Sequence, residues 1–90
     1  MLLLTQAILG QLATSLASLP AGQRAVVHAV RGEVSIRRRL LEMGLCVGVR
    51  VDLIRRAPLR GPIELRVRGY LLSLREEHAA LVQVTPEIAP

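Results

Sequence analysis

Residues 37–48, RRRLLEMGLCVG, contain the end of a helix and the approach to a strand. Ile36, Leu40 and Met43 fall at positions i, i+4 and i+7, which share one face of an α-helix. An apolar stripe of this kind is typical of a helix that packs on a core. The stretch therefore predicts a short helix whose three apolar side chains are buried.

Both ends of this helix carry signals of their own. Ser35 is placed to cap the first turn. Gly44 supplies the left-handed residue that commonly closes a helix, and Leu45 can pack back on the last turn. Arg37 and Arg38 point away from the apolar stripe, so we expect them to form the outer wall of the helix.

Short strands are predicted on both sides of the helix. The run IELRVR has the cleanest alternation, with Ile63, Leu65 and Val67 facing inward. The predicted strands are residues 23–31, 48–56, 63–68, 70–74 and 80–84, with a turn of helix or a bend at 75–79. Five short strands with one helix inserted after the first favour a mainly β fold, a small and strongly bent sheet that closes on itself.

Residues 1–20, MLLLTQAILGQLATSLASLP, predict an additional amphipathic helix before the sheet. On a helical wheel one side gathers the apolar residues Ile8, Leu9, Leu12, Leu16 and Leu19. Pro20 ends this helix, which packs on the domain or joins two copies of the chain in a homo-oligomer. The predicted division is a helical extension at 1–17, a barrel at 18–85 and a tail at 86–90.

The same segment argues against export and against a membrane span. A secretory signal needs a basic region before its apolar core, and no basic residue precedes Arg24. Polar residues interrupt a stretch that is already near the minimum length for crossing a bilayer. The lone Cys46 cannot form an internal disulfide, so the fold does not depend on an oxidising compartment and we expect the cytoplasm.

Composition narrows the functional classes. The chain has 90 residues and a formal net charge of +5, with twelve arginines and no lysine. One core is expected at this length. The basic surface suits nucleic acid, an acidic protein or the cytoplasmic face of a membrane. The lack of lysine removes a P-loop lysine and Schiff-base chemistry, and no nucleophile with a base and an orienting acid is recognisable, so we expect no enzyme.

A resident metal or cofactor is not expected. The only soft or imidazole ligands are Cys46, His28 and His78, whose spacing matches no ligand motif. Adventitious binding of a divalent metal by Glu76, Glu77 and His78, which follow one another in one turn, is easier to envisage.

Four stretches in the right order resemble the FeoA family, small SH3-like barrels that accompany the bacterial ferrous iron transporter FeoB. They are SLPAGQRAVVHAV, RRLLEMGLCVGVRVDLIRRAP, PIELRVRG and LLSLREEHAALVQV, between about Leu16 and Val84. Val47 departs from the family's usual proline, and Arg60 and Gly61 depart from its usual loop. The family typically has an acidic residue at the position of His78, and Met43 replaces a leucine.

The resemblance implies an SH3-like barrel of about five strands and a non-enzymatic accessory role. Such a protein binds and modulates the cytoplasmic GTPase domain of FeoB. It is then cytoplasmic, held at the inner face of the membrane through its partner without spanning it, and it binds no nucleic acid.

Two groups of residues are candidates for contact with a partner. One is a basic wall of Arg37, Arg38, Arg55 and Arg56, and the other is the loop tip with Pro58, Leu59, Arg60 and Pro62. Guanidinium groups pair well with carboxylates, and loops on a rigid sheet can present side chains without disturbing the core. The alternative is that these are ordinary solvated residues.

Two other functions stay open at this point. A basic nucleic-acid-binding barrel would use stacked aromatic side chains, and the chain offers only Tyr70. An SH3-like regulatory domain related to iron-dependent repressors would need a DNA-binding helix pair upstream, for which residues 1–19 are too few.

Overall fold

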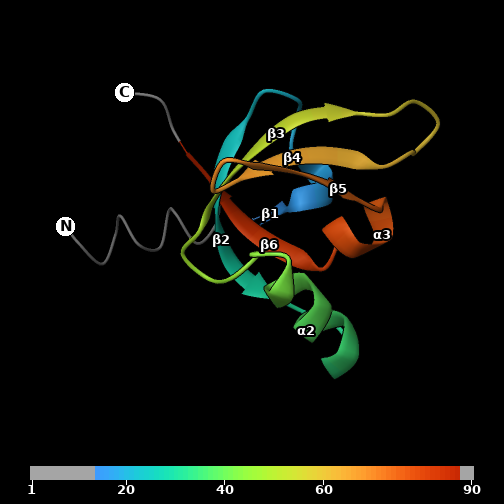
Figure 1. Ribbon diagram of the computed structural model, residues 1–90. Helices are drawn as coiled ribbons and strands as arrows, with labels where there is room; N and C mark the ends of the chain where they lie inside the picture. The colour runs from blue at the N-terminus through green and yellow to red at the C-terminus, as the bar shows by residue number, and fades with distance from the viewer. Residues whose placement is uncertain (1–13, 88–90) are drawn as a thin grey trace.

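The computed structural model describes residues 14–87 and forms one curled antiparallel sheet with two short α-helices (Figure 1). The elements are β1 (Thr14–Ser15), the 3-10 helix η1 (Leu16–Ser18), β2 (Arg24–Val30), α2 (Val34–Glu42), β3 (Arg50–Arg56), β4 (Ile63–Val67), β5 (Tyr70–Leu74), α3 (Glu76–Ala79) and β6 (Val82–Pro86). Within residues 14–87, six strands lie in the order β1-β6-β2-β3-β4-β5. The mainly β fold with a helix between its first two long strands is therefore confirmed.

The prediction of an amphipathic helix near the N-terminus is wrong for the part that the structure describes, which begins at Thr14. Thr14 and Ser15 form a strand that pairs with Val84 and Gln83 of β6, and Leu16–Ser18 form a 3-10 turn. Residues 1–13 lie outside the described residues. Pairing with the edge of β6 satisfies backbone groups that a helix would satisfy internally, and tertiary context routinely overrides a local periodicity.

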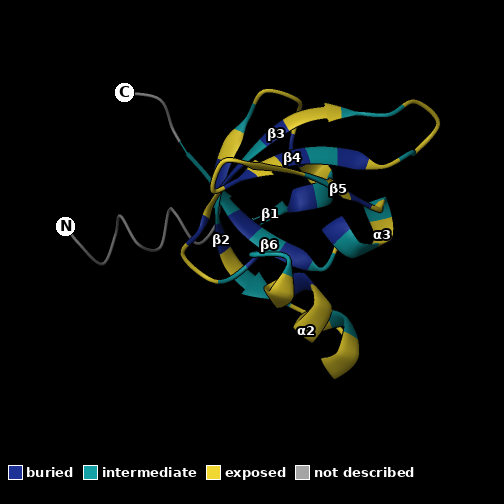
Figure 2. Cartoon of the chain, viewed as in Figure 1, coloured by how far each residue is buried: buried dark blue, intermediate teal, exposed yellow. Residues whose placement is uncertain are grey.

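The core is aliphatic and lies inside the curl of the sheet. Ile63, Leu65 and Val67 are all buried, as their alternation predicts, and β4 carries alternating burial in Figure 2. Register shifts at Val27/Ala29 in β2 and at Leu53/Arg55 in β3 mark bulges. Because a bulge bends its strand and increases the local twist, these two irregularities help the sheet to curl.

The C-terminal end of α2 forms as the sequence predicts. Gly44 has φ +100°, its N–H donates to Leu41 O, and the N–H of Leu45 donates to Leu40 O. These two hydrogen bonds are those of a Schellman motif. Leu40 and Leu45 are both fully buried, so the last turn of α2 is fixed to the core at this end.

The rest of the predicted helix needs two corrections. Glu33, not Ser35, is the N-cap residue, and the hydroxyl of Ser35 lies 3.4 Å from Glu33 Oε1 rather than capping the backbone. Of the predicted apolar stripe only Leu40 is fully buried, whereas Ile36 and Met43 are partly buried against the core. The helix starts earlier than expected and projects from the sheet, so its outer turns have less to pack against (Figure 1).

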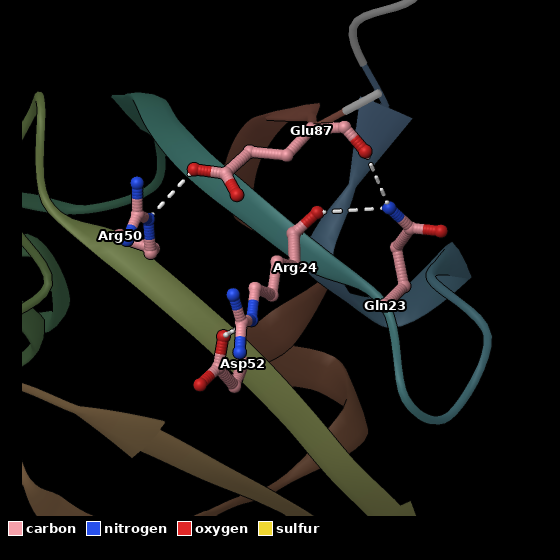
Figure 3. A network of polar contacts seen from close by, with 5 residues as sticks. All are labelled: Gln23, Arg24, Arg50, Asp52 and Glu87. Atoms are coloured by element: carbon pink, nitrogen blue, oxygen red, sulfur yellow. Dashed lines mark hydrogen bonds and ion pairs between the residues drawn. The ribbon is translucent and has the colours of Figure 1, made fainter. Parts of the chain in front are cut away.

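A polar network ties the end of β6 to β2 and β3 (Figure 3). The side-chain amide of Gln23 donates to the carbonyl oxygens of Arg24 and Glu87, at 3.0 Å each. Arg50 Nε lies 2.7 Å from Glu87 Oε1. Arg24 Nε lies 3.2 Å from Asp52 Oδ1, and this second ion pair lacks hydrogen-bond geometry. No local sequence pattern predicts this network, because residues of different strands meet in it only through strand pairing.

Candidate protein-interaction surface

The outer face of α2 borders an apolar groove. Val34 and Leu41 of the helix are 58% and 49% exposed, and Val47 in the following loop is 68% exposed. The groove has a volume of about 390 Å³ and is lined by Val30, Val34, Arg37, Arg38, Leu41 and Val47. We call this the α2 groove. Its two arginines were predicted from the sequence to be exposed, whereas its apolar lining was not predicted.

Arg37 and Arg38 are exposed at this groove, as predicted. Neither side chain forms an ion pair with any residue between 14 and 87. Both guanidinium groups therefore remain available, within that part of the chain, to carboxylates on another molecule.

Arg55 and Arg56 do not join them in one basic wall. Both are at the end of β3, which lies on a different side of the molecule from α2 (Figure 1). Arg55 pairs with Glu64 at 3.0 Å, and this hydrogen bond and charge raise the pKa of Arg55 above its ordinary value. Arg56 donates a hydrogen bond to the carbonyl oxygen of Leu19. Both guanidinium groups therefore already have partners within the fold.

The loop between β3 and β4 extends away from the sheet (Figure 1). The N–H of Gly61 donates to Pro58 O at 3.2 Å, and Leu59 and Arg60 between them both have φ +58°. The side chain of Leu59 is 99% exposed. Pro58, Leu59, Arg60 and Pro62 are all exposed, so the structure presents the loop tip that the sequence singled out.

A second, more polar hollow separates this loop from α3. It has a volume of about 290 Å³ and is lined by Arg60, Gly61, Pro62, Arg75, Glu76 and Glu77. Arg75 Nη1 lies 3.7 Å from Glu77 Oε1, and both side chains are largely exposed. An exposed pair at this distance is weak and leaves the hollow accessible to solvent.

The cysteine and the two histidines, the side chains best suited to bind a transition metal, lie in different parts of the fold. His28 is exposed on β2, Cys46 follows α2 with its Sγ 3.7 Å from Gly44 O, and His78 lies on α3. No group of three or more His, Cys, Asp or Glu residues that could hold a metal ion occurs in residues 14–87. Since zinc sites take three or four such ligands, the donors that the structure describes do not fit a resident zinc ion.

The helices between residues 14 and 87 are also too short and too polar for one of them to cross a lipid bilayer.

A family profile and a curated relative both match this chain. The profile described as "FeoA domain" matches residues 14–86. A curated relative, the Fe(2+) transport protein A/Fe(2+) transporter FeoB fusion protein of Porphyromonas gingivalis, is 41% identical over 69 residues, which are 77% of this chain and 8% of the relative. The chain thus spans a small fraction of that fusion protein.

Solved structures share the fold. The FeoA protein of Chlorobium tepidum is 40% identical with a TM-score of 0.75, over 81% of this chain and 70% of that chain. A zinc complex of FeoA from Stenotrophomonas maltophilia, described as an SH3 domain protein, is 31% identical with a TM-score of 0.69, over 79% and 88%. A manganese-dependent transcriptional repressor shares the fold alone, at 17% identity and a TM-score of 0.77 over 83% and 42%.

Proposed function

The chain belongs to the FeoA family, and on that premise we propose that it is a non-enzymatic accessory protein of bacterial ferrous iron uptake. In this proposal it binds the cytoplasmic GTPase domain of a FeoB-type transporter and modulates it. Its place is the cytoplasm, at the inner face of the membrane through its partner. Ferrous iron is the cargo of the transporter and needs no resident site in this chain.

The fusion protein of Porphyromonas gingivalis carries the proposal. There a segment 41% identical to this chain is part of one polypeptide named for both the transport protein and the transporter FeoB. Covalent linkage keeps two modules at high effective concentration, which favours even a weak contact between them. A separate FeoA chain would have to make the corresponding contact through its own surface.

The exposed surface of the chain offers two regions for that contact. One is the α2 groove with Arg37 and Arg38, and the other is the loop tip with Leu59 and Arg60. Both present apolar side chains beside guanidinium groups, the combination that suits an acidic protein surface. Neither region offers stacked aromatic side chains, so the proposal favours a protein partner over single-stranded nucleic acid.

Titration of the full chain against the isolated cytoplasmic domain of the FeoB-type transporter from the same organism tests the proposal. We expect saturable binding at moderate salt, measured by calorimetry, and a changed rate of GTP hydrolysis in the bound domain. A labelled oligonucleotide is the control ligand. Tight oligonucleotide binding without saturable binding to the transporter domain would contradict the proposal and indicate a nucleic-acid-binding protein.

Adventitious metal binding by Glu76, Glu77 and His78 remains part of this proposal. These residues lie in the single turn of α3, where Arg75, the residue before the helix, also pairs with Glu77. These three side chains do not form a group of metal ligands in residues 14–87, so any binding would involve fewer ligands and be weak, and removal of metal with a chelator should leave the contact with the transporter unchanged.

A further inference from the structure

Helix α2 is poorly supported by the rest of the fold. It has nine residues, of which only Leu40 is fully buried, and Figure 2 shows most of its surface as exposed. Isolated helices shorter than about 12 residues are marginal in water, so a helix of this length depends on tertiary packing. A partner that packs on its unburied side would therefore stabilise the helix.

That side has a definite pattern. Successive helical residues turn by about 100°, which places Val34, Arg37, Arg38 and Leu41 within one arc of about 100° on the exposed side of α2. Val34 and Leu41 form the middle of the arc, with Arg37 on one flank and Arg38 on the other. An apolar strip with a cation on each side is complementary to an amphipathic helix that carries carboxylates on both flanks.

The strip is also concave. Val30 at the end of β2 and Val47 in the loop after α2 complete the lining of the α2 groove, with a volume of about 390 Å³. A groove can receive side chains from a helix laid along it, whereas a flat lipid surface makes no use of a hollow. Membrane-surface helices moreover present Trp, Phe or Leu in quantity, and this face has one leucine.

Charge argues against two other occupants. Residues 1–13 contain no Asp or Glu and would leave Arg37 and Arg38 without carboxylates. In a symmetric pairing of two α2 faces, Arg37 and Arg38 of one copy would approach the same residues of the other, and like charges repel. An acidic segment of a different protein avoids both penalties.

We propose that the α2 groove is the docking site for an acidic amphipathic helix of the partner. The helix would insert large apolar side chains, spaced i and i+3 or i+4, between Val34, Leu41 and Val47. Its Asp or Glu residues would pair with Arg37 and Arg38. This inference rests on the proposed function for the identity of the partner and assigns the segment to the transporter's cytoplasmic domain.

Two matched pairs of variants test it in the same titration. Arg38→Glu reverses a charge at the groove, and Arg66→Glu reverses an exposed charge on β4. Leu41→Ser removes an exposed leucine from the groove, and Leu71→Ser removes one from β5 that is 66% exposed. We expect Arg38→Glu and Leu41→Ser to weaken binding about tenfold or more, and their controls to change it by less than about threefold.

Melting temperatures near that of the unaltered protein would show that all four variants fold. Equal affinity of the variants for the transporter domain would overturn the inference alone, whereas no binding by the unaltered chain would overturn the proposed function as well. Loss of binding to vesicles of phosphatidylglycerol in Arg38→Glu, with transporter binding unchanged, would also overturn the inference and assign the groove to a membrane.

A peptide probe tests the chemistry of the occupant. A short helical peptide with leucines at i, i+3 and i+7 and glutamates on both flanks should shift the amide resonances of Val34, Leu41 and Val47. The same peptide with lysines in place of the glutamates should bind more weakly. Equal binding of both peptides would overturn the acidic requirement.

Discussion

Leu40 and Leu59 are at opposite extremes of exposure in this fold. Leu40 has no exposed surface, whereas Leu59 is 99% exposed at the tip of the loop between β3 and β4. Leu59 also has φ +58°, a left-handed conformation that is costly for residues other than Gly, Asn and Asp. This strained conformation holds an apolar side chain that adds no packing to the core. We therefore expect Leu59 to serve contact with another molecule rather than the stability of the fold.

Leu59→Asn should therefore raise the free energy of unfolding by about 0.5–1 kcal/mol, since asparagine adopts the left-handed region more readily. Chemical denaturation of the variant and the unaltered chain measures the change. Leu71→Asn is the control, because Leu71 is also exposed but lies in a strand. A loss of stability in Leu59→Asn would show that leucine makes a favourable contact at this position.

Helix α2 shows how an element can be fixed at one end and open at the other. At its C-terminus Gly44 and Leu45 close a Schellman motif over the buried Leu40. At its N-terminus no side chain caps the backbone, and Ser35 contacts Glu33 instead. The two ends should therefore respond differently to substitution.

Gly44→Ala should lower the free energy of unfolding by about 1 kcal/mol, and Ser35→Ala should change it by less than about 0.5 kcal/mol. A Cβ at Gly44 would meet Val67 Cγ1 at 3.7 Å, an ordinary contact, so the cost is the φ of +100°. Thermal denaturation of both variants checks the pair. A larger loss in Ser35→Ala than in Gly44→Ala would mean that the serine caps the helix after all.

At the scale of the whole molecule, the sheet begins earlier than the predicted barrel. The strand β1 pairs with β6, and Leu16, the first residue of η1, and Leu19, which follows η1, are both buried. The edge of the sheet and part of the core therefore come from a segment whose sequence pattern is helical. The end of β3 lies on a different side of the molecule from α2, so Arg55 and Arg56 do not form one surface with Arg37 and Arg38 (Figure 1).

A chain that starts at Ser18 should be less stable than one that starts at Thr14. The shorter chain lacks β1 and the fully buried Leu16, and removal of one buried leucine costs about 2–5 kcal/mol. Comparison of the two melting curves tests this, with light scattering to record the oligomeric state of each. Identical curves would mean that β1 and Leu16 contribute nothing to the fold.

Features that depend on local spacing can be predicted from the sequence alone. Alternation fixed the inward residues of β4, and Gly44 fixed the end of α2, because side-chain direction and left-handed φ are properties of short segments. The four ordered stretches also identified the family. These predictions needed no knowledge of which segments meet.

The contacts between distant residues, in contrast, became visible only in the folded structure. Strand pairing places Thr14 and Ser15, near the end of the predicted N-terminal helix, in β1 and brings Arg55 beside Glu64. The position of α2 and of the loop after it leaves Val34, Leu41 and Val47 exposed around one groove. Contacts between residues distant in sequence depend on how the sheet curls and where each element leaves it, and a local pattern carries no information about either.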